Sequence, residues 1–115
     1  MKRGDVYPAN LEPRSGSEQR GRRPVVVISH DALNQIKNWR SIIVIPLSTS
    51  PFQAKRSLTI VPISQGVANL SKESVALCHQ VTTLDRSKFE QYIGSLPSKV
   101  MRKIEEGLKA AMDLF

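Results

Sequence analysis

The feature that most constrains the fold is the abrupt change of character at Pro24. Before it, residues 14–23 form a strip of small and polar residues that carries four arginines and one glutamate. From Pro24 to Ser29 the chain is then an almost unbroken apolar, β-branched run, which is typical of a strand buried on both faces. The sequence therefore predicts a charged loop at the mouth of a rigid strand, where binding and catalytic residues concentrate.

Further strand patterns recur along the chain. Apolar stretches bounded by Pro, Gly or Ser predict strands at residues 3–7, 41–47, 58–63, 74–81 and 91–94. We expect Pro46 to cut the second of these strands short, because proline removes a ladder hydrogen bond. A short helical segment is expected at residues 31–37, with Asp31 as its N-cap.

The C-terminal segment, Pro97–Phe115, carries the one long helical pattern. Its apolar residues recur at helical period in a single stripe, which predicts an amphipathic helix with that stripe in the core. Gly107 is costly inside a helix and predicts a close approach to another element. The stripe consists of Val100, Ile104, Leu108 and Ala111, with Met101 and Met112 beside it.

Several short strands followed by one helix predict a mostly β, α+β domain or a small barrel with an appended helix. The 115 residues suit a single domain, 1–115. The only cysteine, Cys78, excludes an internal disulfide. No signal-peptide pattern or apolar run of about 20 residues is present, so we expect a soluble, cytoplasmic protein with no membrane partner.

The net charge of +7 is unevenly placed. Residues 1–60 hold ten Lys and Arg against four Asp and Glu, whereas residues 61–115 hold seven against six. A basic surplus confined to one part indicates a polyanionic partner, either a nucleic acid or an acidic protein segment, although solubility alone is the simpler alternative.

The chemistry available to the strip is metal-independent. The two histidines, His30 and His79, lie far apart in the sequence and no His/Cys/Asp cluster has ligand spacing, so we expect no metal and no cofactor. What remains is a carboxylate, several guanidiniums and hydroxyls. RNA supplies its own nucleophile, the 2′-OH, so such a set can cleave it with Glu18 as base and Arg23 as stabiliser of the anionic phosphorus centre.

Four segments of this sequence together resemble the MazF/PemK toxin family, and the similarity covers essentially the whole chain. The most specific is the G-S-E-Q-x-G-x-R-P pattern that begins at Gly16. The segments are RGDVYPANLEP at Arg3–Pro13, GSEQRGRRPVVVIS at Gly16–Ser29, IIVIPLSTS at Ile42–Ser50 and VALCHQVTTLDRSKF at Val75–Phe89.

The resemblance implies a small SH3-like β-barrel with a C-terminal helix, paired as a homodimer. It implies a sequence-specific, metal-independent endoribonuclease that cleaves single-stranded RNA to 2′,3′-cyclic phosphate and 5′-OH ends. The implied partners are the RNA, a cognate antitoxin with an acidic C-terminal segment and, through that antitoxin only, operator DNA.

Carried over by position, the resemblance assigns catalysis to Arg23, Glu18 and Ser48. The family has threonine where this chain has Ser48, and Thr49 is the alternative source of the hydroxyl. Neighbours on a strand face opposite ways, so only one of the two can point into the site. We expect the two apolar runs to pair as strands, which would bring Ser48 alongside Arg23. The expected RNA-binding residues are Ser17, Gln19, Arg20, Arg22, Thr49 and Lys55.

Two other functions remain open from the sequence. The serine at position 48 leaves room for a weakly active or inactive member that binds antitoxin or operator DNA. The related CcdB branch poisons DNA gyrase with the same barrel. That function has no use for an Arg/Glu/hydroxyl set, so the ribonuclease is the better prediction.

Overall fold

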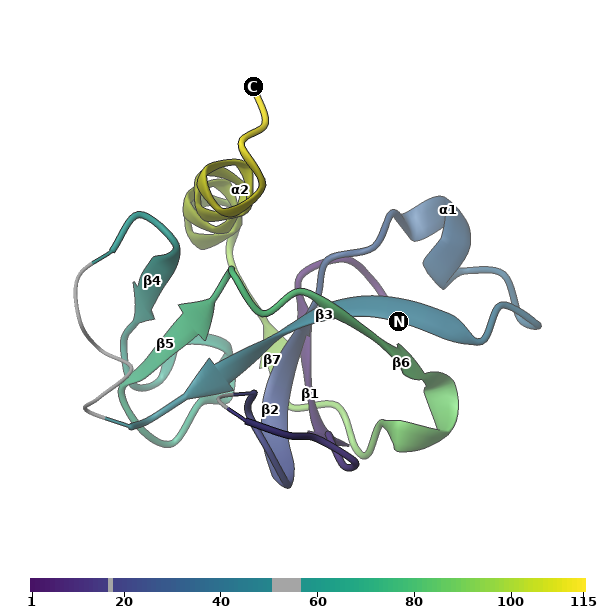
Figure 1. Cartoon of the computed structure of the whole chain (residues 1–115). Coiled ribbons are helices and arrows are strands. Elements are labelled where there is room, and N and C mark those ends of the chain that lie inside the picture. The colour runs from purple at the N-terminus through teal and green to yellow at the C-terminus, as the bar shows by residue number, and fades with distance from the viewer. Residues whose placement is uncertain (17, 51–56) are drawn as a thin grey trace.

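The computed structural model of the chain describes residues 1–16, 18–50 and 57–115. Its sheet is antiparallel in the order β4-β5-β3-β2-β1-β7, with β6 paired to β3. The sheet curls into a half-barrel and the long helix α2 lies against one end of it (Figure 1). The predicted mostly β class with a terminal helix is confirmed. In chain order the elements are β1 (Asp5–Asn10), β2 (Arg22–Val27), α1 (Asp31–Asn34), β3 (Ser41–Ser48), β4 (Ile60–Ile63), η1 (Val67–Asn69), β5 (Ser74–Leu77), β6 (Thr82–Asp85), η2 (Arg86–Lys88), β7 (Gly94–Ser95) and α2 (Ser98–Met112).

Strand β3 is central to the sheet and is longer than the sequence predicted. One edge pairs with β2, whereas the other edge pairs with β6 through residues 41–44 and with β5 through Leu47 and Ser48. The expectation that Pro46 ends this strand is wrong. Pro46 lies in the short interval that has neither a β5 nor a β6 partner in register, so its missing N–H falls where the sheet changes partners.

The stretch predicted as one strand at residues 74–81 is two elements. Strand β5 ends at Leu77, the N–H of Gln80 donates to the Leu77 carbonyl, and the chain turns before β6 begins. Strand β6 was not predicted, because its four residues Thr82–Asp85 contain only one large apolar side chain. The other strands begin or end a few residues from their expected bounds.

Helix α2 packs its apolar stripe into one of the two buried hydrophobic clusters of the domain. Ile104 is fully buried, and a Cβ added at Gly107 would lie 2.7 Å from Cys78 Sγ, which confirms the close approach predicted there. The helix ends at Met112, and Asp113 follows in a left-handed conformation. Met112 was expected in the core but is 48% exposed.

A second buried cluster lies around β1, β2 and β3, and no part of α2 belongs to it. It consists of Ala9, Leu11, Val25, Val27, Ile42, Val44 and Leu84. Helix α1, a single turn, lies beyond the part of the sheet that holds this second cluster (Figure 1). Its N-cap is His30, whose Nδ1 accepts the Ala32 N–H at 2.9 Å, and not Asp31 as expected. The described part of the chain contains no helix long and apolar enough to cross a membrane.

Candidate active site

The register of β2 and β3 gives the two main candidate residues the same face of the sheet. The last pair of this ladder is Val25 with Pro46. Arg23 precedes Val25 by two residues and Ser48 follows Pro46 by two, and both still belong to their strands. Residues opposite each other in an antiparallel pair project from the same face. The pairing of the two apolar runs, which the sequence predicted, therefore presents a guanidinium and a hydroxyl on one face.

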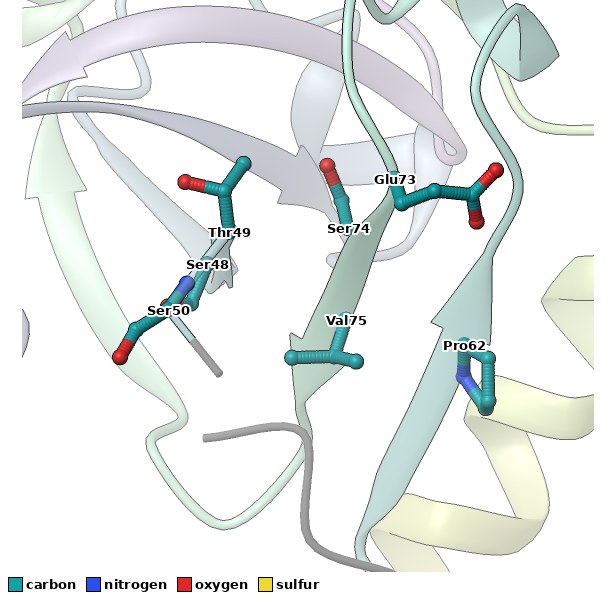
Figure 2. Close-up of a pocket in the computed structure, with 7 residues that line it drawn as sticks. All are labelled: Ser48, Thr49, Ser50, Pro62, Glu73, Ser74 and Val75. Atoms are coloured by element: carbon teal, nitrogen blue, oxygen red, sulfur yellow. The ribbon is translucent and has the colours of Figure 1, made fainter. Parts of the chain in front are cut away.

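Ser48 lies at the base of a cleft with a volume of about 260 Å³ (Figure 2). Its side chain is almost fully buried, and its Oγ accepts the Ser50 N–H at 3.1 Å, so its own hydroxyl hydrogen can point toward a ligand. Thr49 is exposed and also lines the cleft, but Thr49 and Ser50 point in opposite directions. By strand parity Ser48 projects from the same face as Pro46, whereas Thr49 follows the end of β3.

The arginines of the loop differ in what neutralises them. The Arg14 guanidinium pairs with Glu18 at 2.9 Å, Arg20 lies 3.7 Å from the Glu12 carboxylate, and Arg22 pairs with Glu90 at 2.7 Å. Within residues 1–16, 18–50 and 57–115, Arg23 is in no ion pair.

Arg23 is held in place by backbone and remains exposed. Its Nε donates to the Arg20 carbonyl at 3.0 Å. It therefore offers the remaining face of its guanidinium to an anion without first losing a carboxylate partner.

Glu18 is exposed and turned toward its own loop. Its Oε2 accepts from Arg14, and its Oε1 accepts from the Ser15 N–H and hydroxyl at 3.3 Å. The hydrogen bond from Arg14, followed by the one from the Ser15 backbone, lowers the pKa of Glu18 below its ordinary value. Glu18 therefore remains ionised, and in the free protein its carboxylate accepts hydrogen bonds from its own loop.

Two residues that sequence reasoning did not assign hold the loop in shape. Glu12 Oε1 accepts the Gly21 N–H at 2.9 Å and Glu12 Oε2 accepts the Arg14 N–H at 3.2 Å. The Gln19 N–H donates to the side chain of Gln80 at 2.9 Å, which ties the loop to the turn between β5 and β6. Both residues lie inside the segments that resemble the family, but nothing in their spacing indicated these contacts.

Both loop glycines have positive φ angles, 62° for Gly16 and 71° for Gly21. Two of the predicted RNA-binding residues, Ser17 and Lys55, lie outside the described residues. No group of three or more His, Cys, Asp or Glu side chains that could hold a metal ion occurs in the part of the chain that the structure describes.

Cys78 does not form a nucleophilic pair with its neighbour His79. The Cys78 thiol is fully buried and desolvation raises its pKa to about 11, whereas His79 is exposed. A nucleophilic cysteine requires a lowered pKa, so the thiol belongs to the core.

Comparison with known proteins identifies the family of the chain. Residues 2–112 match the family model described as the PemK-like, MazF-like toxin of type II toxin–antitoxin systems. The chain is 33% identical over 114 residues to the endoribonuclease MazF of Staphylococcus saprophyticus, with 99% of this chain and 92% of the relative covered.

Solved structures give the same fold. MazF of Deinococcus radiodurans superposes with a TM-score of 0.81 at 24% identity, covering 99% of this chain and 97% of that one. A mycobacterial endoribonuclease solved with its cognate antitoxin also has a TM-score of 0.81, at 21% identity, covering 100% and 97%. The chain therefore belongs to the family of PemK-like, MazF-like toxins of type II toxin–antitoxin systems.

Proposed function

We propose that this chain, as a MazF-type endoribonuclease toxin, cleaves single-stranded RNA at specific sequences and without a metal ion. The attacking group is the 2′-OH of the substrate, and the products are a 2′,3′-cyclic phosphate and a 5′-OH. The observation that supports the proposal is the β2–β3 register, which ends at Val25 with Pro46 and gives Arg23 and Ser48 the same face, with Ser48 lining a cleft. A buried hydroxyl and a guanidinium that has no ion-pair partner among the described residues are suited to the oxygens of a phosphodiester.

Each group has one role in the proposed reaction. Arg23 donates forked hydrogen bonds to the non-bridging oxygens and stabilises the charge that builds there. Ser48 donates its hydroxyl hydrogen to a phosphate oxygen and fixes the phosphorus in line with the 2′ oxygen. Glu18 takes the 2′-OH proton as the bond from the 2′ oxygen to phosphorus forms. The bond to the 5′ oxygen then breaks, and this oxygen takes a proton from solvent.

The remaining loop residues position the RNA. Arg20 and Arg22 bind phosphates by exchanging their carboxylate partners for the substrate, and Gln19 and Thr49 face the bound strand. Ser17 and Lys55 are part of the same proposal on the sequence alone.

The partners in this proposal are a second copy of the chain and a cognate antitoxin. Structural neighbours from mycobacteria and Deinococcus radiodurans are solved with an antitoxin, which supports such a partner here. We propose that its acidic C-terminal segment occupies the Arg23 strip in place of RNA, because both ligands are extended anions. Operator DNA is reached through the antitoxin.

A cleavage assay in EDTA tests the function. A long single-stranded RNA is incubated with the protein and the new 5′ ends are mapped. We expect discrete cuts that are lost in Arg23→Ala and Ser48→Ala and retained or increased in Ser48→Thr. The matched control is Arg22→Ala, which removes the same charge from the neighbouring position and should mainly weaken binding.

Three outcomes of this assay would contradict the proposal. The absence of cuts across a varied RNA would favour an inactive member or a gyrase poison. Cutting that is absent in EDTA and appears when magnesium is added would contradict metal independence. Loss of activity in Thr49→Ala but not in Ser48→Ala would move the hydroxyl to Thr49.

A further inference from the structure

The cleft beside Ser48 has a floor that the cleavage chemistry does not use. In the sheet register Ser48 lies opposite Val75, and Val75 lies opposite Pro62. The three side chains therefore form one row across β3, β5 and β4 and project from one face. Neighbouring strands are about 5 Å apart, so a flat group resting on Val75 and Pro62 lies immediately beside a phosphate held at Ser48.

The cleft is small, and one of the described residues that line it is charged. Its volume of about 260 Å³ lies just below the ~300–1,000 Å³ of pockets for drug-sized ligands, which suits a single heterocyclic base. The charged group is the carboxylate of Glu73 on its rim (Figure 2). Glu73 Oε1 accepts the Gln65 N–H at 3.0 Å, so the carboxylate has a fixed orientation.

A carboxylate here is unfavourable for unselective RNA binding, because it repels the phosphates. It is favourable only where a bound group donates hydrogen bonds to it, since a carboxylate accepts and does not donate. Guanine presents two adjacent donors on its Watson–Crick edge, N1–H and N2–H₂, which match the two oxygens of a carboxylate. Uracil presents one donor between two carbonyl oxygens, which the carboxylate repels.

We propose that this cleft, which we call the Glu73 pocket, binds the base adjacent to the scissile phosphate and selects guanine over uracil. The pocket is lined by Ser48, Thr49, Ser50, Pro62, Glu73, Ser74 and Val75. The base rests on Val75 and Pro62, and its Watson–Crick edge meets Glu73, in the way that unstacked RNA bases are commonly read. The inference rests on the proposed ribonuclease function and adds a specificity-determining residue to it.

The test is the base profile around the cut in a randomised single-stranded RNA, mapped for the wild type and for Glu73→Gln. We expect the guanine-to-uracil ratio at one position next to the cut to fall by about tenfold or more in Glu73→Gln, with the other positions unchanged. The control Glu106→Gln removes one negative charge from the exposed face of α2 and should leave the profile as in the wild type. Identical profiles for wild type and Glu73→Gln, with both proteins active, would overturn the assignment of Glu73.

A second measurement separates the pocket from the chemistry. Short oligonucleotides with a 2′-deoxy sugar at the cut position, differing only in the adjacent base, are bound to wild type and Glu73→Gln. The wild type should bind the guanine oligonucleotide about tenfold more tightly than the uracil one, and Glu73→Gln should lose that difference. If the wild type binds both equally, the pocket proposal fails even where cleavage is observed. If cleavage is absent but the base preference is present, only the ribonuclease proposal fails.

Discussion

Arg23 and its three neighbours in the loop show how the surroundings of a side chain decide its use. Arg14, Arg20 and Arg22 each have a carboxylate partner, so part of their charge is already neutralised in the free protein. Among the described residues, Arg23 has no carboxylate partner, and its Nε donates to a backbone carbonyl. The fold thus leaves available the arginine that shares a face with Ser48.

Arg23→Lys should separate charge from geometry. Lysine keeps the positive charge but loses the planar fork of donors, so RNA affinity should change little while the cleavage rate falls by about 10²-fold or more. The comparison is single-turnover cleavage and binding of a 2′-deoxy substrate, with Arg22→Lys measured in parallel. A cleavage rate in Arg23→Lys equal to that of the wild type would show that Arg23 only binds phosphate.

Glu18 predicts a specific pH dependence. A base must be deprotonated to act, so the rate rises with pH through the pKa of Glu18, and Arg14 holds that pKa low. Cleavage should therefore be lost only below the ordinary Glu range of about 4.3. Arg14→Ala removes the largest cause of the shift and should move the acid limb to higher pH. Glu18→Gln should abolish the limb together with most of the activity, and an unchanged profile in Glu18→Gln would assign the base elsewhere.

At the scale of single residues, the sequence predicted the types of the site residues and the pairing of the two strands that carry them. It did not predict the hydrogen bonds and ion pairs that these residues make. The spacing of two apolar runs was enough to expect Ser48 beside Arg23, because antiparallel neighbours are the usual connection. That Glu18 pairs with Arg14 and that Gln80 supports Gln19 depends on how the loop folds back on itself. A loop path of this kind has no periodicity from which a sequence pattern could predict it.

At the scale of an element, helix α2 and strand β6 differ in how clearly the sequence predicts them. Its apolar stripe has helical period and predicted both the helix and its buried face. Strand β6 has no comparable signal, because it pairs with the first half of β3 through a short segment with mostly polar side chains. Pro46 was misleading for a related reason, since its effect depends on whether a neighbouring strand needs its N–H, and here β3 changes partners at that point.

Gly107→Ala tests the contact between α2 and the sheet. The added Cβ would lie 2.7 Å from Cys78 Sγ in a fully buried site. Overpacking costs about 1–3 kcal/mol, which should exceed the ~1 kcal/mol gained in helix propensity. Urea unfolding should therefore show a net loss of stability, and Gly107→Ala/Cys78→Ala should recover part of it relative to the sum of the single changes. A stabilised Gly107→Ala would mean that α2 lies farther from β5 than described.

At the scale of the whole molecule, the surplus of positive charge in residues 1–60 predicts salt-sensitive RNA binding. Each phosphate neutralised on a single strand contributes about 0.7 to the slope of log affinity against log salt. Arg23→Ala should reduce that slope by about 0.7, measured with a 2′-deoxy oligonucleotide. Lys109→Ala, on the exposed side of α2, should leave it unchanged. Equal slopes for wild type and Arg23→Ala would mean that Arg23 meets no phosphate.

The change of partners along β3 has a consequence for how such toxins diverge. Arg23 and Ser48 lie on β2 and β3, whereas the floor and rim of the Glu73 pocket come from β4, β5 and the residues beside them. Among the described residues, two register pairs, Leu47 with Ala76 and Ser48 with Val75, join β5 to β3. If the Glu73 pocket and the Arg23–Ser48 pair act as proposed, substitutions in the β4–β5 segment would alter which base is accepted while Arg23 and Ser48 stay unchanged. The base preference and the cleavage reaction could then diverge independently among relatives of this chain.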